Sequence, residues 1–320
     1  MKVHLRHHLL LIAMIILIFS IGLSSCTYSI DSKPTPTPND IENEQLEIKP
    51  GLGRSYQDQA YCTVDGVELT FDLSYPQTGE APYPLVIYVH GGSWQAGDKR
   101  GGAGIVFKEP LLESGFAFAS INYRLSPENT FPAHIQDVKC AVRFFRTSAS
   151  LLDLDPDRIA ALGGSAGAHL VALLGLTSDM NLWENSGGYQ GISSEVAAVV
   201  DMFGPADITG MSHPDYQNAF LGVFGEAVRS EDALWAYSPL AYVSEDSPPF
   251  LIMHGDADQV VSLQQSKDLY SALQEAGVPS ELIVVNGGGH SNQLLAERAA
   301  PTQEELTSSL LEFLIDHLGQ

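Results

Sequence analysis

The stretch RIAALGGSAGAHLVALLGL, residues 158–176, says more about the fold than any other part of this 320-residue chain. A short apolar run typical of a buried strand leads into the G-x-S-x-G motif at residues 163–167, and an apolar helical pattern follows it. In a glycine-rich chain the motif alone is a common chance match, but between a strand and a helix it is the setting of a nucleophile elbow. We therefore predict that Ser165 is a nucleophile presented at a sharp turn.

Two later strands end in the partners that such a serine requires. A serine hydroxyl is a poor nucleophile unless a neutral imidazole takes its proton and a carboxylate orients that imidazole. The apolar run at 249–255 leads into Asp256 and Asp258, and the run at 281–286 leads to His290. The order Ser, Asp, His is the one expected when all three leave the carboxyl ends of strands. We predict His290 as the base and Asp258 as the orienting acid, with Asp256 as the competing candidate.

A glycine pair follows another predicted strand. The apolar run PLVIYV leads directly into HGGSW at residues 90–94. Glycine-rich backbone at this place can point amides at the oxyanion of a tetrahedral intermediate. We predict oxyanion donors from Gly91, Gly92 and Ala166, and a plain turn is the alternative. Trp94 is a candidate wall of the acyl pocket, with simple core packing as the alternative.

The remaining histidines have structural interpretations. We expect His169 to pack beneath the elbow, because it lies one helical turn after the serine. His134 and His254 are expected to be hydrogen-bonded structural residues, and His213 belongs to a long interval loop. No grouping of His, Cys and acidic residues has metal-ligand spacing, so the sequence predicts neither a metal nor a cofactor.

Short apolar runs alternate with amphipathic helical stretches along most of the chain. This alternation predicts an α/β fold with a mostly parallel, twisted sheet of about eight strands and helices on both faces. Alternating residues around an Asp-Gly turn predict an antiparallel hairpin at residues 61–75. The interval 205–249 interrupts the rhythm with scattered aromatics, and we expect short helices there that form a small lid or pocket wall. A structural insertion packed elsewhere is the alternative.

The chain begins with the features of an export signal. A positively charged start precedes an apolar run of about fifteen residues, which suits a secretory signal better than a membrane span. Leu-Ser-Ser-Cys at residues 23–26 resembles a bacterial lipobox, which predicts a lipoprotein signal peptide at 1–25 and a membrane anchor on Cys26. An ordinary signal peptide and an uncleaved anchor are the alternatives. All three place the rest of the chain at the cell exterior or in the periplasm. Residues 26–55, rich in Pro, Thr and acids, predict a flexible tether before a catalytic domain at 56–320.

Composition limits the possible partners. With 44% hydrophobic residues the chain can bury a large core. Its net charge of -23, with no basic run after the N-terminus, argues against a nucleic-acid partner. Cys62 and Cys140 are the cysteines of the predicted catalytic domain. An oxidising compartment permits a bridge between them, but the sequence cannot show that they approach each other. Neither has a neighbouring base, so we expect two buried, unpaired thiols.

These motifs together resemble the hormone-sensitive-lipase-like esterases and the bacterial feruloyl-esterase-like α/β hydrolases. The resemblance runs from Tyr61 to the C-terminus. Its segments are HGGSW at 90–94, YRLSPE at 123–128 with FP at 131–132, DPDRIAALGGSAGAHL at 155–170, HGDADQVV at 254–261 and GGGH at 287–290. The resemblance implies the α/β-hydrolase fold and makes Asp258, rather than Asp256, the acid of the H-G-x-x-D stretch. It implies that residues 123–132 are scaffold behind the oxyanion loop.

The chain departs from the lipase-like pattern in two places. It has a tether and a predicted hairpin where a helical cap is typical, and GGSAG where GDSAG is typical, which favours the feruloyl-esterase-like branch. The resemblance implies a serine carboxylesterase that forms an acyl-enzyme on Ser165 and hydrolyses short-chain or small aryl esters, free or polymer-linked. The alternatives are an amidase or exopeptidase, a feruloyl or acetyl esterase acting on plant polysaccharide, and a surface binding protein without catalysis. Because a base must be neutral, activity is expected to rise with pH as His290 loses its proton.

Overall fold

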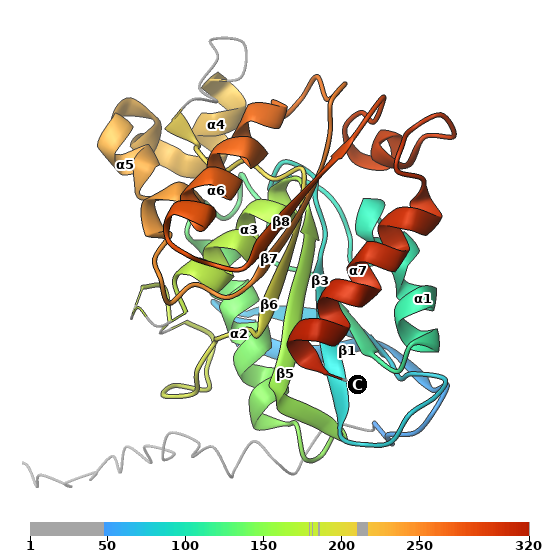
Figure 1. The fold of residues 1–320 in the computed structure, drawn as a ribbon. Coiled ribbons are helices and arrows are strands. Elements are labelled where there is room, and N and C mark those ends of the chain that lie inside the picture. Colours follow the sequence, from blue (N-terminus) through green and yellow to red (C-terminus); the bar gives the residue numbers. More distant parts are fainter. Residues whose placement is uncertain (1–47, 179, 181, 185, 210–216, 320) are drawn as a thin grey trace, which may run out of the picture. The chain divides into compact units, whose positions relative to one another are not determined.

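The structure, a computed structural model, describes residues 48–178, 180, 182–184, 186–209 and 217–319 (Figure 1). The predicted signal peptide at 1–25, Cys26, most of the predicted tether and His213 lie outside the described residues. Within the described part of the chain, no helix is both long enough and apolar enough to cross a bilayer.

The described residues form a sheet of eight strands in the order β1-β2-β4-β3-β5-β6-β7-β8. The strands are β1 (Ser55–Val64), β2 (Val67–Ser74), β3 (Tyr83–Val89), β4 (Ala117–Ile121), β5 (Leu154–Gly164), β6 (Ala198–Met202), β7 (Phe250–Gly255) and β8 (Ser280–Val285). Strands β3 to β8 pair in parallel, while β2 pairs antiparallel with both β1 and β4. The predicted mostly parallel sheet is confirmed.

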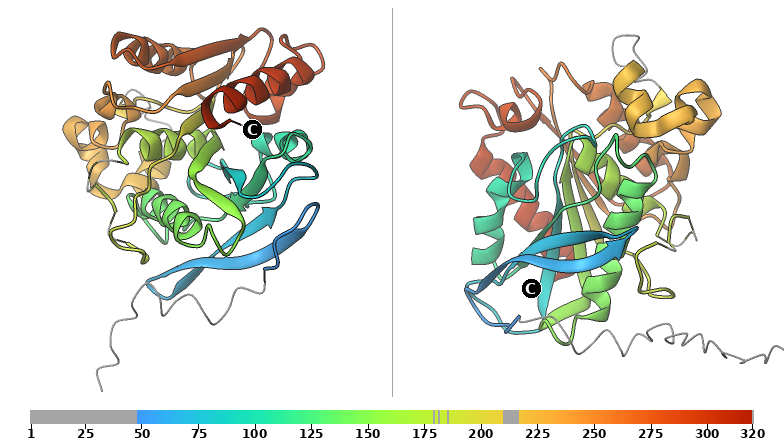
Figure 2. Two further views of the ribbon diagram at one scale, coloured as in Figure 1. Left: turned by 60° about the horizontal axis from the view of Figure 1, so that its bottom comes forward. Right: turned by 180° about the vertical axis from the view of Figure 1, so that it is seen from behind.

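Helices cover both faces of the sheet (Figures 1 and 2). Among the described residues outside the interval 205–249, the helices are η2 (Ala103–Phe107), α1 (Lys108–Glu113), α2 (Ala133–Thr147), α3 (Ala166–Leu176), α6 (Leu263–Glu275), η7 (Ser291–Leu295) and α7 (Gln303–Leu318). One apolar cluster includes Leu170 of α3 and Leu269 of α6, and a second includes Leu111 of α1 and Leu310 of α7. The sheet therefore separates two apolar layers, as expected for an α/β fold.

The strand β3 shows why these apolar runs become strands buried on both faces. Its seven residues are all buried, and alternate side chains enter opposite layers. Leu85 and Ile87 belong to the cluster of α3 and α6, while Val86 and Tyr88 belong to the cluster of α1 and α7. A continuous apolar sequence is needed because neither face of this strand meets water.

The strands β1 and β2 form the predicted hairpin around Asp65-Gly66, and a disulfide ties it to α2. Cys62 on β1 is bonded to Cys140 on α2, with 6.6 Å between the two Cα atoms. The expectation of two unpaired thiols is therefore wrong. The physical reason is that α2 packs beside β1, which brings together residues 78 positions apart in the sequence. Spacing along the chain contains no information about that approach.

Residues 48–54 lie against the folded domain although they fall within the predicted tether. Ile48 is buried, and the Tyr56 hydroxyl donates to the Lys49 carbonyl at 2.6 Å. The Gly53 amide donates to the Pro76 carbonyl at 2.8 Å. The folded part of the chain therefore extends upstream of residue 56 to at least Ile48.

The described part of the interval 205–249 contains the predicted short helices. They are α4 (Gln217–Phe224), η5 (Gly225–Arg229), α5 (Glu231–Trp235) and η6 (Pro239–Tyr242). The Phe224 ring lies 5.3 Å from the Trp94 ring and 5.6 Å from the Phe131 ring, measured between centroids. The Phe131 amide donates to the Val223 carbonyl at 2.7 Å. These contacts hold the helices near the carboxyl ends of the strands, where Figure 1 shows α4 and α5.

Candidate active site

The turn between β5 and α3 holds Ser165 in a strained backbone conformation. Its φ of 56° and ψ of -120° lie in a region that residues with a Cβ atom rarely adopt. A Cβ on Gly163 would collide with the backbone of Gly167, and one on Gly167 would collide with the Val89 carbonyl. The Ser165 amide donates to the Met202 carbonyl at 2.9 Å, which ties the turn to β6. The glycines make the sharp turn possible, and β6 holds it in place.

The structure brings together the predicted nucleophile, base and acid. Ser165, His290 and Asp258 have the arrangement of a catalytic triad, or acid–base relay. Nε2 of His290 lies 2.9 Å from Oγ of Ser165, and Nδ1 of His290 lies 2.7 Å from Oδ2 of Asp258. Asp258 follows β7 and His290 follows β8, so adjacent parallel strands deliver both to the edge of the sheet where the elbow lies. This arrangement allows the imidazole to take the Oγ proton while the carboxylate holds Nδ1–H.

Asp258 is a buried carboxylate surrounded by hydrogen-bond donors. Its Oδ1 accepts from the amides of Val260 at 2.7 Å and Val261 at 2.9 Å. Its Oδ2 faces His290 and also lies 3.3 Å from Nε2 of His254. Burial alone would raise the pKa of this carboxyl, but the hydrogen bonds from His254, His290 and the two amides outweigh burial and hold the pKa well below its usual range. The site therefore keeps Asp258 ionised next to His290.

Asp256, the competing candidate for the acid, faces another part of the turn. Its side chain is exposed, and Oδ1 accepts from the Gly287 amide at 2.7 Å. That bond links the turn after β7 to the turn after β8. The geometry therefore favours Asp258 over Asp256 as the partner of His290, and it gives Asp256 a role in holding the two turns together.

The HGGSW loop lies directly against the elbow. A Cβ on Gly91 would lie 2.7 Å from the Gly164 carbonyl oxygen and 3.3 Å from Cβ of Ser165. Gly92 has a φ of 126°, a conformation that favours glycine. Ala166 is the first residue of α3, where helix amides have no partner within the helix. Gly91 therefore lies next to the elbow and Ala166 directly follows Ser165, while the oxyanion role of Gly91, Gly92 and Ala166 stays a prediction.

The YRLSPE segment supports the HGGSW loop from behind. The Tyr123 ring stacks on the His90 ring at 4.5 Å, and its hydroxyl donates to the His90 carbonyl at 3.0 Å. The Ser126 amide donates to the Trp94 carbonyl at 2.9 Å. These bonds fix the backbone of the loop from outside the reacting centre, which agrees with the scaffold role that the resemblance implies.

A pocket of about 320 Å³ opens beside Ser165 and His290. Glycine, alanine and serine supply most of its lining, and Phe203 and Val260 supply the large apolar surface. The lining residues are Gly91, Gly92, Ser93, Gly102, Ala103, Gly164, Ser165, Phe203, Val260, His290 and Ser291. The Phe203 ring meets the His290 ring edge-on with centroids 4.9 Å apart. The imidazole of His290 is therefore held by Asp258 at Nδ1 and packs against Phe203 of the pocket wall.

Trp94 is not among the residues that line this pocket. It is 5% exposed, and its indole lies against His169 and Phe224 in the core cluster of α3. Its Nε1–H donates to Nδ1 of His169 at 3.3 Å, and Nε2 of His169 lies 2.8 Å from the Tyr237 carbonyl. Burial lowers the pKa of His169 to about 4. The structure favours the core alternative for Trp94, because the loop turns the indole inward.

Other polar groups of the described chain do not form a comparable centre. His134 is buried and bonds the Ser126 hydroxyl at 3.1 Å. No group of three or more potential metal ligands occurs among the described residues.

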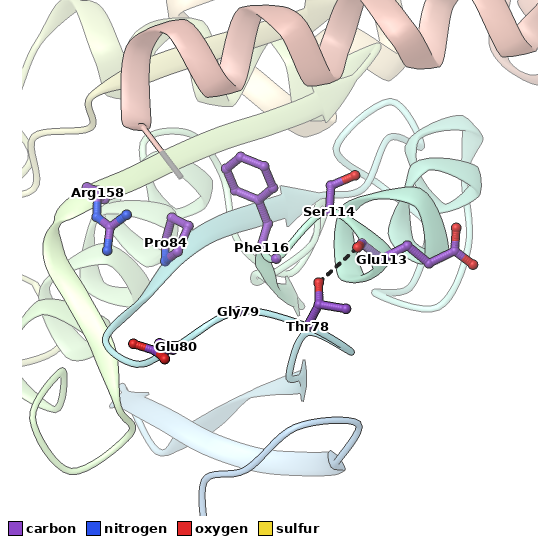
Figure 3. A pocket seen from close by; sticks show the side chains of 9 residues that line it. Thr78, Gly79, Glu80, Pro84, Glu113, Ser114, Phe116 and Arg158 are labelled. Carbon is purple, nitrogen blue, oxygen red and sulfur yellow. Dashed lines mark hydrogen bonds between the residues drawn. The ribbon is translucent and has the colours of Figure 1, made fainter.

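A hollow of about 450 Å³ lies near the start of β3, and Figure 3 shows Glu80, Glu113 and Arg158 around it. None of its nine lining residues is a histidine, so it has no imidazole base.

The chain is similar in sequence to proteins named as esterases. The BD-FAE family model matches residues 71–273. The chain is 32% identical over 243 residues to the probable carboxylic ester hydrolase LipM of Mycobacterium tuberculosis, and 36% identical over 198 residues to the esterase LipQ of that organism. These matches cover 69% and 61% of this chain and 54% and 46% of the relatives, so the chain spans about half the length of the curated relatives it matches.

A solved structure is similar to this chain in fold. A truncated form of a carbohydrate esterase from gut microbiota matches with a TM-score of 0.74 and 30% identity. The match covers 85% of this chain and 99% of that chain. Together with the eight-stranded sheet and its helical layers, this similarity shows that the fold is that of the α/β hydrolases.

Proposed function

The chain belongs to the BD-FAE family, and we propose that it is a serine carboxylesterase that forms an acyl-enzyme on Ser165. The observation that carries this proposal is the continuous path of hydrogen bonds from Oγ of Ser165 through His290 to Asp258, with lengths of 2.9 and 2.7 Å. The relatives named as a carboxylic ester hydrolase and an esterase support ester substrates.

In the proposed reaction, Oγ of Ser165 attacks the ester carbonyl carbon while Nε2 of His290 takes the hydroxyl proton. Asp258 stabilises the resulting imidazolium, and the backbone amides of the elbow and the HGGSW loop bind the oxyanion. His290 then gives its proton to the departing alcohol. A water molecule then attacks the acyl-enzyme carbonyl carbon while His290 takes its proton, and His290 returns that proton to Oγ of Ser165 as the carboxylic acid leaves. The residues present supply every proton transfer, so no cofactor is invoked.

The preferred acyl group in this proposal is short-chain or small and aromatic. The pocket beside Ser165 is small, and the apolar surface of Phe203 and Val260 can contact an acyl or aryl group. The similar structure described as a carbohydrate esterase supports a narrower alternative, in which the esters are acetyl or feruloyl decorations of a polysaccharide.

The proposed place of action is outside the cytoplasm, with a lipid anchor on Cys26. The export-signal features of the N-terminus and the lipobox-like residues 23–26 support the anchor. The Cys62–Cys140 disulfide supports an oxidising compartment, where such bonds persist. Mass spectrometry of the membrane fraction tests this proposal. We expect a cleaved chain that begins with an acylated Cys26, and a chain that still begins at Met1 would contradict the proposal.

The esterase proposal is tested with nitrophenyl acetate, butyrate and octanoate and with methyl ferulate, using the full chain and Ser165→Ala. We expect hydrolysis of the short esters by the wild type and a loss of roughly 10⁴-fold or more in Ser165→Ala, because the nucleophile is removed. An aminoacyl anilide in the same assay measures amidase activity. Cleavage of the anilide without cleavage of any ester would replace the esterase with an amidase or exopeptidase, and inactivity on every substrate would favour a binding protein.

A further inference from the structure

His254 is a fully buried histidine near the end of β7 whose ring contacts the acid of the relay. Its Nε2 lies 2.9 Å from the Val261 carbonyl oxygen and 3.3 Å from Oδ2 of Asp258, and its Nδ1 lies 2.7 Å from Oγ of Ser266. Oδ2 of Asp258 is also the atom that faces Nδ1 of His290 at 2.7 Å. Two imidazole rings therefore meet on one carboxylate oxygen.

The contacts of His254 determine which of its nitrogens carries hydrogen. A carbonyl oxygen can only accept, so the contact with Val261 requires a hydrogen on Nε2. The hydroxyl of Ser266 can donate to Nδ1, which fits the tautomer with its hydrogen on Nε2. In this tautomer the Nε2–H is shared between the carbonyl and Oδ2 of Asp258. His254 is thus a donor whose two ring nitrogens contact three groups.

We propose that His254 is a positioning residue that sets both the orientation of Asp258 and the charge that this carboxylate offers to His290. The inference rests on the proposed function. The Nε2–H and the amides of Val260 and Val261 leave the carboxylate one orientation, with Oδ2 toward His290. Because two donors share Oδ2, that oxygen stabilises the imidazolium of His290 less than it would with a single donor. His290 consequently gives up its proton more readily to the departing alcohol.

The charged groups around His254 come from three strands. Asp258 lies on the turn after β7, His290 follows β8, and Asp201 lies on the neighbouring strand β6, close enough to interact electrostatically with His254. The helix α6 presents the neutral hydroxyl of Ser266 to the ring. Its charged residues are exposed: Lys267, Asp268 and Glu275. Phe or Gln at position 254 therefore changes the bond to Oδ2 and brings no charge of its own to these groups.

The test compares the full-length wild type with His254→Phe and His254→Gln by the pH dependence of kcat and KM on a nitrophenyl ester. Phe occupies the ring volume without a donor, whereas the Gln amide can place an N–H near the position of Nε2. For His254→Phe we expect the acid limb of kcat/KM to move to higher pH by about half a unit to one unit. We expect kcat to fall by roughly tenfold and KM to change by less than about twofold, because His254 does not line the pocket.

His254→Gln should bring the acid limb back toward its wild-type position. His134→Phe is the matched control, since His134 is equally buried, bonds a serine hydroxyl and has no hydrogen bond to the relay within the described structure. Its acid limb should stay at the wild-type position. An unmoved limb in folded His254→Phe, or an equal shift in His134→Phe, would overturn the inference.

A measurement on the wild type covers the case in which His254→Phe does not fold. Nitrogen NMR of the histidine rings near neutral pH should show the Nε2–H tautomer for His254. An Nδ1–H tautomer would overturn the inference, because no donor would then face Asp258. Failure of the proposed function is a separate result: a wild type that hydrolyses no ester removes the esterase assignment, whereas the tautomer reports on the bond to Asp258 independently.

Discussion

Asp258 and Asp201 are two buried carboxylates near the carboxyl ends of adjacent strands, and their surroundings differ. Asp258 accepts hydrogen bonds from two backbone amides and faces two imidazoles. Asp201 accepts from the Gly204 amide at 2.8 Å. Burial alone would raise both pKa values, but the donors hold the pKa of Asp258 well below its usual range, whereas burial raises the pKa of Asp201 to about 6.

The difference shows that burial does not determine the charge of a carboxylate. Taking a carboxylate out of water is costly, and only hydrogen bonds or opposite charges offset that cost. The turn after β7 supplies such bonds to Asp258, which makes it a fixed negative charge beside His290. The end of β6 supplies fewer compensating interactions to Asp201, so its ionised form is costly in the folded state. Donors around a buried acid therefore indicate a charge that the site uses.

The largest expected difference between Asp258 and Asp201 is the loss of activity when each is replaced. Asp258→Asn should lower kcat by about 10⁴-fold, because an amide facing Nδ1 favours the wrong tautomer of His290. Asp201→Asn should stay within about tenfold of the wild type, since its amide oxygen can still accept from Gly204. Steady-state hydrolysis of nitrophenyl acetate measures both. Equal losses in the two variants would remove the functional distinction between the acids.

A smaller expected difference between the two acids is their effect on the stability of the folded protein. Asp201→Asn should raise the free energy of unfolding at neutral pH by about 1–3 kcal/mol, because the variant no longer ionises a buried group. The upper limit follows from the gap between the raised pKa of about 6 and the ordinary aspartate value of 3.8. Urea unfolding of both proteins at several pH values measures the change. Asp201→Asn less stable than the wild type at neutral pH would contradict the assignment.

The pH window of that effect follows from the direction of each shift. Because the pKa of Asp201 is raised on folding, the folded state binds more protons between pH values of about 4 and 6, and stability falls as the pH rises through this window. Asp258 has the opposite sign: its lowered pKa contributes stability at neutral pH that is lost as the medium becomes acidic. In Asp201→Asn the fall between about pH 4 and 6 should disappear, and the acid loss should remain.

The smallest expected effect concerns the turn that serves Asp201. A Cβ on Gly204 would lie 2.7 Å from Cβ of Ala168 and 2.8 Å from Oδ1 of Asp201. Gly204→Ala should therefore lower the free energy of unfolding by about 1–2 kcal/mol through overpacking. Thermal unfolding of Gly204→Ala is compared with that of Gly188→Ala. A Cβ on Gly188 meets no atom within 4 Å, so this control measures only the strain of its positive φ of 109°. A fully stable Gly204→Ala would mean that the turn relaxes at little cost.

Much of the fold followed from the sequence because it depends on local patterns. Apolar runs such as β3 had to be strands covered on both faces, and the Asp-Gly pair at residues 65–66 closed the predicted hairpin. The elbow was recognisable because its glycines stand between a strand and a helix. The order of Ser165, Asp258 and His290 then indicated the relay, since parallel strands bring their carboxyl ends to one edge of the sheet.

Other features depend on contacts between distant segments, and the sequence could not show them. The Cys62–Cys140 bond requires α2 beside β1, and Trp94 turns inward because α3 and α4 supply His169 and Phe224. His254 looked structural in the sequence, and its contact with Asp258 appears only when the turn after β7 folds back. The one available signal was its place at the start of the H-G-x-x-D stretch.

The sequence by itself determined the layered fold, the elbow and the order of the relay, because these arise from the periodicity of side chains and from glycine conformations along the chain. The charge of each buried acid and the disulfide were decided by tertiary structure alone. Tertiary structure also gave a geometric reason for Asp258 over Asp256, which the family resemblance had only implied. The physical reason is that hydrogen bonding and desolvation depend on distances across several ångströms between residues far apart in sequence. Two aspartates two positions apart, such as Asp256 and Asp258, therefore face different partners on the same turn.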